Sequence, residues 1–139
     1  MIVLDTSGLL SSLYPDQTRH ADCRRVLERE AGPFLLSPFV VAEMDYLIGR
    51  NRGLADQLAF LAEIGDGAYR LIPFDAADLA IARQLMETYG DLRVGLADAS
   101  LVVLAARHRT RRVLTLDERH FRAIRSLDGA HFELLPADV

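Results

Sequence analysis

The chain has 139 residues, half of them hydrophobic, which suits one domain with a sizeable core and leaves no need for a second domain. Its net charge of -4 excludes a global positive field as the means of attracting nucleic acid, so any such binding must be local. All 16 basic residues are arginine, which excludes every mechanism that requires a lysine.

The sequence also bears on targeting to membranes and on disulfide formation. No apolar run approaches the roughly 18 to 20 residues of a membrane span, and the apolar start lacks the basic region and cleavage site of a signal peptide. We therefore expect a cytoplasmic protein without membrane contact. The single cysteine, Cys23, excludes an internal disulfide, and we expect it to pack as a small hydrophobic side chain.

Short apolar runs alternate with longer helical patterns along residues 1–139. Strands are predicted at residues 2–5, 34–37, 70–74, 112–117 and 131–135. Helices are predicted at residues 16–30, 38–50, 54–64, 75–90 and 96–108, with Asp16, Ser37 and Asp75 as N-caps. This alternation predicts a single α/β domain, in which helices flank a mostly parallel central sheet of about five strands. Ligands of such sheets bind beyond the carboxyl ends of the strands.

An aspartate stands at the end of two predicted strands. Asp5 follows the first apolar strand, and Asp117 follows the fourth. Because the carboxyl ends of parallel strands meet at one edge of a sheet, the two carboxylates can come together there. A threonine lies near each, Thr6 in the first case and Thr115 in the second. The alternative stays open that each aspartate only begins a turn or caps the next helix. For Ser7, we expect only a cap of the helix that follows.

Asp98 is the only charge in the apolar stretch LADASLVVLAA, residues 96–106. At 100 degrees per residue it shares a helix face with Leu101, Val102 and Ala105. An ionised carboxylate on an apolar face is costly unless it is paired, hydrogen-bonded or bound to a metal. The alternative is an N-cap, but Leu101 stands three residues on, where a capping box would have Glu or Gln.

Glu43 lies at the edge of the apolar stripe of the predicted helix 38–50. It projects about 40 degrees from Leu47 and can therefore face a cleft. Taken alone, Glu43 would be a surface charge. The stripe itself is formed by Val40, Val41, Met44, Leu47 and Ile48.

Four carboxylates in one pocket would repel one another without a cation, and some would be protonated at neutral pH. Magnesium and manganese ions prefer carboxylate and water oxygens as ligands. A cation held there can acidify an attacking water and neutralise a phosphate, which suits the hydrolysis of phosphodiester bonds.

Four ordered blocks of the sequence resemble the PIN-domain ribonucleases, and within them the VapC toxins of bacterial toxin-antitoxin systems. The resemblance covers nearly the whole chain, and the blocks are MIVLDTSGLL, SPFVVAEMDYLI, GLADASLVVLAA and RVLTLDERHF. It implies a PIN-like three-layer sandwich and a metal-dependent endoribonuclease that hydrolyses RNA. It also implies that the acidic Mg²⁺ or Mn²⁺ site consists of Asp5, Glu43, Asp98 and Asp117.

The resemblance has further implications for the site and its partners. It implies that Thr6 and Thr115 support the carboxylates by hydrogen bonds. Many relatives have a further acidic residue three positions after the one that matches Asp117, where this chain has His120, so one or two metals remain open. The resemblance also implies a homodimer, neutralised by a VapB-type antitoxin that supplies any DNA binding. The substrate class would be tRNA or rRNA.

Contacts to RNA must come from local groups near the acidic pocket. Candidates for phosphate or substrate binding are Arg93, Arg112, Arg119 and His120. Tyr14, Tyr46 and Phe121 are candidates for base stacking, with nothing in the sequence to rank them.

Three other functions compete with this one. Phosphatases and receivers that use an aspartate nucleophile after a strand rely on a lysine, which this chain lacks. A non-catalytic binding module of the same fold stays open, although all four acidic positions are occupied. A solitary nuclease without an antitoxin also stays open.

Overall fold

The central sheet has five strands, all parallel, in the order β3-β2-β1-β4-β5. This computed structural model describes all 139 residues. The strands are β1 (Ile2–Leu4), β2 (Phe34–Leu36), β3 (Arg70–Leu71), β4 (Arg112–Leu114) and β5 (Glu133–Leu135). Each lies within its predicted range, and the predicted α/β fold with a parallel sheet is confirmed. Four of the five strands end before the range predicted for them, because the residues at the carboxyl end turn out of the sheet.

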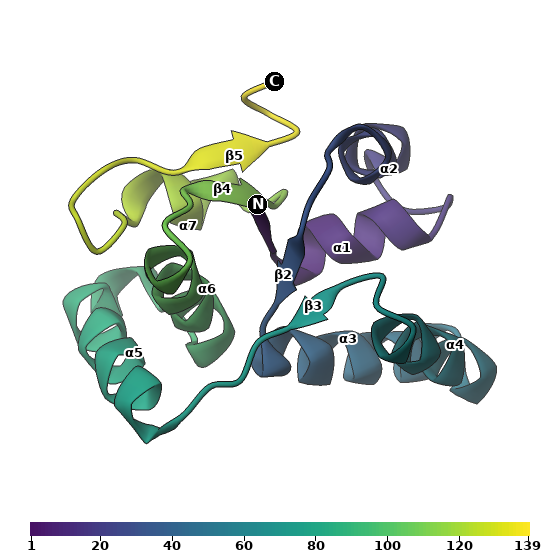
Figure 1. The fold of residues 1–139 in the computed structure, drawn as a ribbon, viewed down its shortest axis with the longest axis horizontal. Coiled ribbons are helices and arrows are strands. Elements are labelled where there is room, and N and C mark those ends of the chain that lie inside the picture. The colour runs from purple at the N-terminus through teal and green to yellow at the C-terminus, as the bar shows by residue number, and fades with distance from the viewer.

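Helices cover both faces of this sheet. They are α1 (Thr6–Leu13), α2 (His20–Arg29), α3 (Pro38–Asn51), α4 (Leu54–Gly65), α5 (Ala76–Thr88), α6 (Leu96–Arg107) and α7 (Glu118–Ala123), with a 3-10 turn η1 at Gly90–Leu92. Figure 1 shows α1 and α2 packed together on one side of the sheet, and α5 and α6 packed together on the other. The α3 and α4 helices lie beside β2 and β3. None of these helices combines the length and apolar character needed to cross a membrane.

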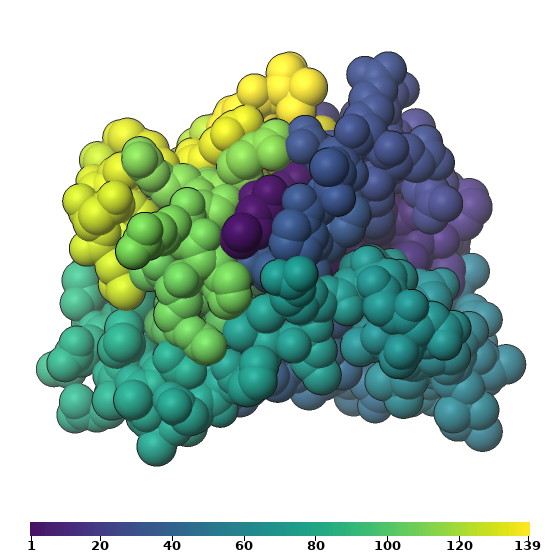
Figure 2. Space-filling view, in the orientation of Figure 1, coloured from purple at the N-terminus to yellow at the C-terminus, as the bar shows by residue number.

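The core is built around β1, which lies between β2 and β4. Val3 is the register partner of both Leu35 and Val113. In Figure 2, the first residues of the chain are enclosed between the segments near residues 30–35 and 110, far apart in the sequence. The three residues of β1 are fully buried, as the apolar pattern of a parallel strand predicts.

Helix α2 begins later than predicted. Asp16 was expected to cap it, but the helix starts at His20, after Arg19 in a left-handed conformation with φ 57°. The Asp16 carboxylate instead pairs with Arg52, 3.1 Å away, at the end of α3. The predicted cap is therefore wrong, because a distant arginine engages the carboxylate. The other two predicted caps are confirmed, Ser37 at α3 and Asp75 at α5.

Gly8 allows α1 to start in close contact with β4. A Cβ atom at this position would lie 2.6 Å from the carbonyl oxygen of Leu114, closer than real Cβ atoms approach a neighbour. The backbone N–H of Asp5 donates to the same carbonyl oxygen, at 3.0 Å. The first turn of α1 is therefore pressed against the end of β4, and this fixes where Asp5 stands.

Candidate active site

The four acidic residues singled out from the sequence line one cleft of about 470 Å³. The cleft lies at the carboxyl edge of the sheet, where β1 ends at Leu4 and β4 ends at Leu114. Its lining residues are Asp5, Thr6, Ser7, Leu10, Glu43, Tyr46, Leu47, Asp98 and Asp117.

Asp5 is the most deeply placed carboxylate of the cleft, with 5% of its surface exposed. Two hydroxyl groups donate to its Oδ2 atom, that of Thr115 at 2.7 Å and that of Ser7 at 2.8 Å. Burial raises the pKa of Asp5, the two hydroxyl donors oppose this rise, and the nearby charge of Asp117 adds to it. A cation beside Asp5 would relieve the cost of its buried negative charge.

Ser7 is not the helix cap expected from the sequence, because it is the second residue of α1 and Asp5 stands at the N-cap position. Its Oγ donates to Asp5 and accepts a hydrogen bond from the backbone N–H of Leu116 at 3.0 Å. The same oxygen lies 3.3 Å from the hydroxyl of Thr115. Ser7 thus joins the ends of β1 and β4 behind the carboxylate. Its position two residues after Asp5 was the only signal in the sequence.

Thr6 contacts a different carboxylate from the one beside it in the sequence. Its Oγ1 donates to Oε1 of Glu43 at 2.6 Å, which connects the start of α1 to the middle of α3. Glu43 is exposed at the cleft rim. The bond holds one oxygen of Glu43 in place and leaves Oε2 free to accept a further hydrogen bond from the cleft.

Asp98 lies in the first turn of α6, but it is not the cap of that helix. The N-cap residue is Gly95, so the capping alternative for Asp98 is wrong. Burial raises the pKa of Asp98 to about 6, the charge of Asp5 adds to the rise, and His120 opposes it. Its side chain is one-fifth exposed and faces the cleft.

A buried pair of serines ties the helix of Asp98 to the helix of Glu43. The hydroxyls of Ser37 and Ser100 lie 2.7 Å apart, and both residues are fully buried. Ser37 caps α3, while Ser100 stands two residues after Asp98 in α6. This pair was not found from the sequence, because serines of two distant segments carry no pattern that connects them.

Asp117 combines the two roles that its sequence position left open. Its Oδ1 accepts a hydrogen bond from the backbone N–H of His120 at 3.1 Å and so caps α7. Its Oδ2 lies 3.1 Å from Nδ1 of His120. The capping alternative is correct for one oxygen, and the second oxygen lies beside the ring of His120.

His120 lies between two of the cleft carboxylates. Its Nδ1 is 3.2 Å from Oδ2 of Asp98, in addition to its contact with Asp117. One potential ligand atom from each of the three side chains lies within 4.8 Å of the others. The donor set fits a divalent cation, because carboxylate oxygens predominate and the buried charge of Asp5 is unpaired by any arginine.

Arg112 does not lie near the cleft, which corrects its candidacy for substrate binding. It is the first residue of β4, at the amino edge of the sheet, and it forms ion pairs with Glu30 at 2.8 Å and Glu133 at 3.3 Å. Its sequence distance from Asp117 is short, but the strand carries the two residues to opposite edges. Arg93 and Arg119 are both exposed and form no ion pair.

Only one of the three candidate aromatics lines the cleft. Tyr46 is 62% exposed and lies three residues after Glu43 on α3, so it shares that side of the helix. Phe121 is buried in the core, and Tyr14 lies under the guanidinium of Arg52 at 3.8 Å. The structure thus singles out Tyr46, which the sequence could not rank.

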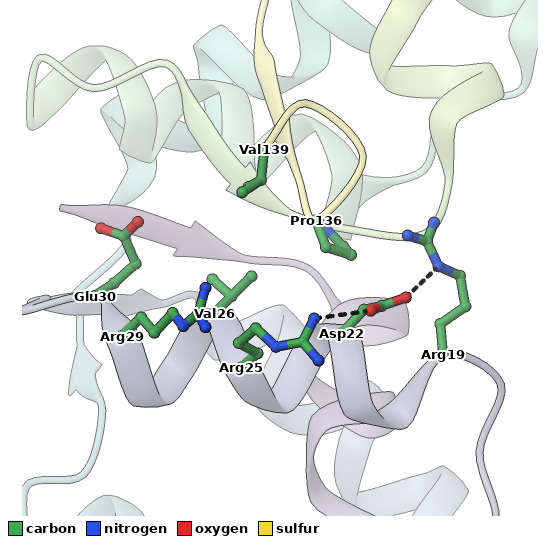
Figure 3. A pocket seen from close by; sticks show the side chains of 8 residues that line it. All are labelled: Arg19, Asp22, Arg25, Val26, Arg29, Glu30, Pro136 and Val139. Carbon is green, nitrogen blue, oxygen red and sulfur yellow. Dashed lines mark hydrogen bonds and ion pairs between the residues drawn. The ribbon is translucent and has the colours of Figure 1, made fainter.

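A second pocket, of about 210 Å³, lies between α2 and the C-terminal residues. Figure 3 shows Arg25 and Arg29 on α2 and Arg19 just before it, with Arg19 and Arg25 both directed at Asp22. Pro136 and Val139 close the other side. Since Asp22 pairs with two of its arginines and no carboxylate cluster lies there, the chemistry described above belongs to the first cleft.

Comparisons with known proteins agree with the fold. A sequence model of the PIN domain matches residues 2–127. Ribonuclease VapC26 of Mycobacterium tuberculosis is 41% identical over 135 residues, which make up 97% of this chain and 100% of that protein. The crystal structure of VapC20 from Mycobacterium tuberculosis, a sarcin-ricin loop cleaving toxin, has a TM-score of 0.78 at 18% identity, covering 84% of this chain and 90% of that one. A toxin-antitoxin complex from Klebsiella pneumoniae contains a chain with a TM-score of 0.66 at 17% identity. The match covers 89% of this chain and 92% of that one. The chain therefore belongs to the PIN-domain family.

Proposed function

We propose that this protein is a metal-dependent endoribonuclease that hydrolyses phosphodiester bonds of RNA. The observation that carries the proposal is the meeting of Asp5, Glu43, Asp98 and Asp117 in one open cleft at the carboxyl edge of the sheet. The raised pKa values of Asp5 and Asp98 fit carboxylates that a cation would normally neutralise.

The site would hold Mg²⁺ or Mn²⁺ through Asp5, Asp98 and Asp117, with Glu43 at the rim. The cation supplies positive charge for the phosphate and lowers the pKa of water. Thr115 and Ser7 stabilise the ionised form of Asp5 by donating to its Oδ2. Glu43, fixed by Thr6, offers its second oxygen to orient the attacking water in line with the scissile bond.

RNA would lie across the open side of the cleft. Tyr46 offers an exposed ring on which a base can stack, next to Glu43. Arg93 and Arg119 can contact phosphates, since no acidic side chain pairs with either of them. Neither arginine lines the cleft, so their contacts would supply local positive charge to RNA that extends past it.

We further propose a toxin role. The relative with 41% identity is named a ribonuclease, and two proteins of similar fold are a toxin that cleaves the sarcin-ricin loop and part of a toxin-antitoxin complex. A VapB-type antitoxin, a homodimer and an rRNA or tRNA substrate follow from this role as proposals. RNA and the antitoxin would both be met in the cytoplasm, where we expect the protein to act, with DNA binding only through the antitoxin.

The decisive experiment measures cleavage of a mixture of tRNA and rRNA by purified protein, freed of any antitoxin. Cleavage is expected with Mg²⁺ or Mn²⁺, and none in excess chelator. Asp5→Asn and Asp98→Asn are expected to abolish cleavage while circular dichroism remains native. Full activity in chelator would refute the metal mechanism.

The same experiment separates the competing functions. A non-catalytic binding module would bind RNA but cleave it under no metal condition. A solitary nuclease would cleave RNA, yet its expression in a bacterial host would not be neutralised by any protein encoded beside it. The toxin role predicts growth arrest on expression, relieved by the neighbouring antitoxin.

A further inference from the structure

We propose that Nδ1 of His120 is a direct ligand of the cation, which makes the site a mixed nitrogen and oxygen site that prefers Mn²⁺ to Mg²⁺. The inference rests on the proposed function only in that both place a divalent cation in the same cleft. It assigns a role to the one side chain in the acidic cluster that is not a carboxylate.

The separations in the cluster match those of ligands around one cation. Nδ1 of His120 lies 3.2 Å from Oδ2 of Asp98 and 3.1 Å from Oδ2 of Asp117. Two atoms that bind an octahedral cation at right angles, with bonds of about 2.1 to 2.2 Å, are about 3.0 Å apart. Each aspartate oxygen thus has the separation from Nδ1 that two neighbouring ligands of one ion have, and all three atoms lie within 4.8 Å of one another.

The ring of His120 is held in this position by the fold. Its backbone N–H donates to Oδ1 of Asp117, so Asp117 caps the helix from which His120 projects. The side chain is 21% exposed, between Asp98 and Asp117. When a cation binds Nδ1, the proton of the neutral ring must be on Nε2.

Hydrogen bonding alone gives a competing account of the same contacts. In the metal-free protein, a proton on Nδ1 can be donated to either carboxylate, as in an ion pair. A cation can replace that proton without moving the ring, so the two arrangements are successive states of one cluster. The two arrangements can be told apart by experiment. Only a nitrogen that is bound directly to the metal shows strong hyperfine coupling to it.

A nitrogen ligand changes which metal the site prefers. Mg²⁺ binds oxygen ligands and gives up its waters reluctantly, whereas first-row transition ions accept imidazole readily. With His120 as a ligand, the ratio of the Mg²⁺ dissociation constant to that of Mn²⁺ should be large. Replacing the imidazole by a carboxylate should reduce this ratio.

The test is Mn²⁺ binding to the full chain without RNA, followed by electron paramagnetic resonance, with pulsed detection of nitrogen-14 hyperfine coupling. Wild type is expected to show imidazole coupling, and His120→Gln is expected to lose it and to raise the Mn²⁺ dissociation constant at least about tenfold. His120→Asp should restore binding without the coupling and shift the preference toward Mg²⁺. His131→Gln, at an exposed histidine outside the cleft, is the matched control and should leave coupling and affinity unchanged.

Three results would overturn the inference. Mn²⁺ bound to wild type without imidazole coupling would leave the ribonuclease proposal intact and show that His120 only hydrogen-bonds to the carboxylates. Coupling that persists in His120→Gln would assign the nitrogen to another residue. Wild type that binds no Mn²⁺ would refute this inference and the metal site together, whereas coupling without RNA cleavage would refute only the proposed function.

Discussion

The hydroxyl of Thr6 donates to Glu43 across 2.6 Å, although 37 positions separate the two residues in the chain. The bond connects α1, which begins at the end of β1, with α3, which begins at the end of β2. It therefore holds the exposed carboxylate of Glu43 over a cleft whose floor contains Asp5. Asp5 itself receives its hydroxyl donors from Ser7 and Thr115.

Thr6→Val removes the hydroxyl that donates to Glu43, so the carboxylate of Glu43 should become free to rotate. Because a net hydrogen bond contributes about 1 kcal/mol, kcat for RNA cleavage should fall about five- to tenfold, with little change in KM. Thr6→Ser retains the hydroxyl and should recover most of the activity. Undiminished activity in Thr6→Val, which retains the methyl group but lacks the hydroxyl, would show that the bond to Glu43 does not matter.

Ser7→Ala should raise the pKa of Asp5 further, because it removes one of the two hydroxyls that stabilise the ionised carboxylate. A cation binds the ionised form, so the pH below which Mn²⁺ binding weakens should move to a higher value. The measurement is the Mn²⁺ dissociation constant as a function of pH. Ser12→Ala is the control, since the buried hydroxyl of Ser12 bonds to the carbonyl of Leu9 in the same helix and not to Asp5. If the pH dependence of Mn²⁺ binding is the same in Ser7→Ala as in wild type, Ser7 has no influence on Asp5.

Asp98→Asn should stabilise the metal-free protein at neutral pH. The pKa of Asp98 is about 6 in the folded protein against an ordinary value of 3.8, so the folded state binds this proton more tightly than the unfolded state. The ionised carboxylate thus lowers the free energy of unfolding above pH 6, progressively less between pH 6 and pH 4, and not at all below pH 4. After allowance for solvent exposure, the gain at pH 7.5 should be about 1 to 2 kcal/mol.

The measurement for Asp98→Asn is urea unfolding in chelator at several pH values. The stability difference from wild type should vanish near pH 4 and should reverse at pH 7.5 when Mn²⁺ is added, because only wild type gains from the bound ion. A difference that is independent of pH would show that Asp98 titrates normally.

Tyr46→Ala should weaken RNA binding, because the ring is the only aromatic side chain on the lining of the cleft. Stacking of one base contributes about 1 to 3 kcal/mol, so KM should rise about tenfold while thermal stability stays the same. Tyr46→Phe retains the ring and should behave like wild type. A comparable rise in KM for Tyr46→Phe would assign the contact to the phenolic hydroxyl instead.

Gly8→Ala should destabilise the fold and displace Asp5. The added Cβ would meet the carbonyl of Leu114 at 2.6 Å, and backbone cannot move aside as a flexible side chain can. We expect a loss of about 1 to 3 kcal/mol in the free energy of unfolding, measured in urea. Gly65→Ala is the matched control, because nothing lies within 4 Å of its added Cβ and its stability should not fall. Wild-type stability in Gly8→Ala would mean that α1 and β4 can separate at little cost.

The predicted strands and most predicted helices match the structure because their signals are local. The apolar runs of β1, β2 and β4 and the caps Ser37 and Asp75 are properties of neighbouring residues. The start of α2 was misplaced for the opposite reason, since the partner of Asp16 is the distant Arg52. The substrate role expected for Arg112 failed because nearness in sequence was taken for nearness in space.

A parallel sheet with acidic residues at its carboxyl edge could be inferred from the order of the residues alone. Apolar periodicity shows which segments are buried, and two aspartates that each follow a buried strand must come to the same edge. Which side chains pair is visible only in the folded protein: Thr6 with Glu43, Ser7 and Thr115 with Asp5, and His120 with Asp98 and Asp117. Hydrogen bonds and metal ligation act over about 2 to 3 Å, so they depend on strand register and helix placement, which periodicity does not encode.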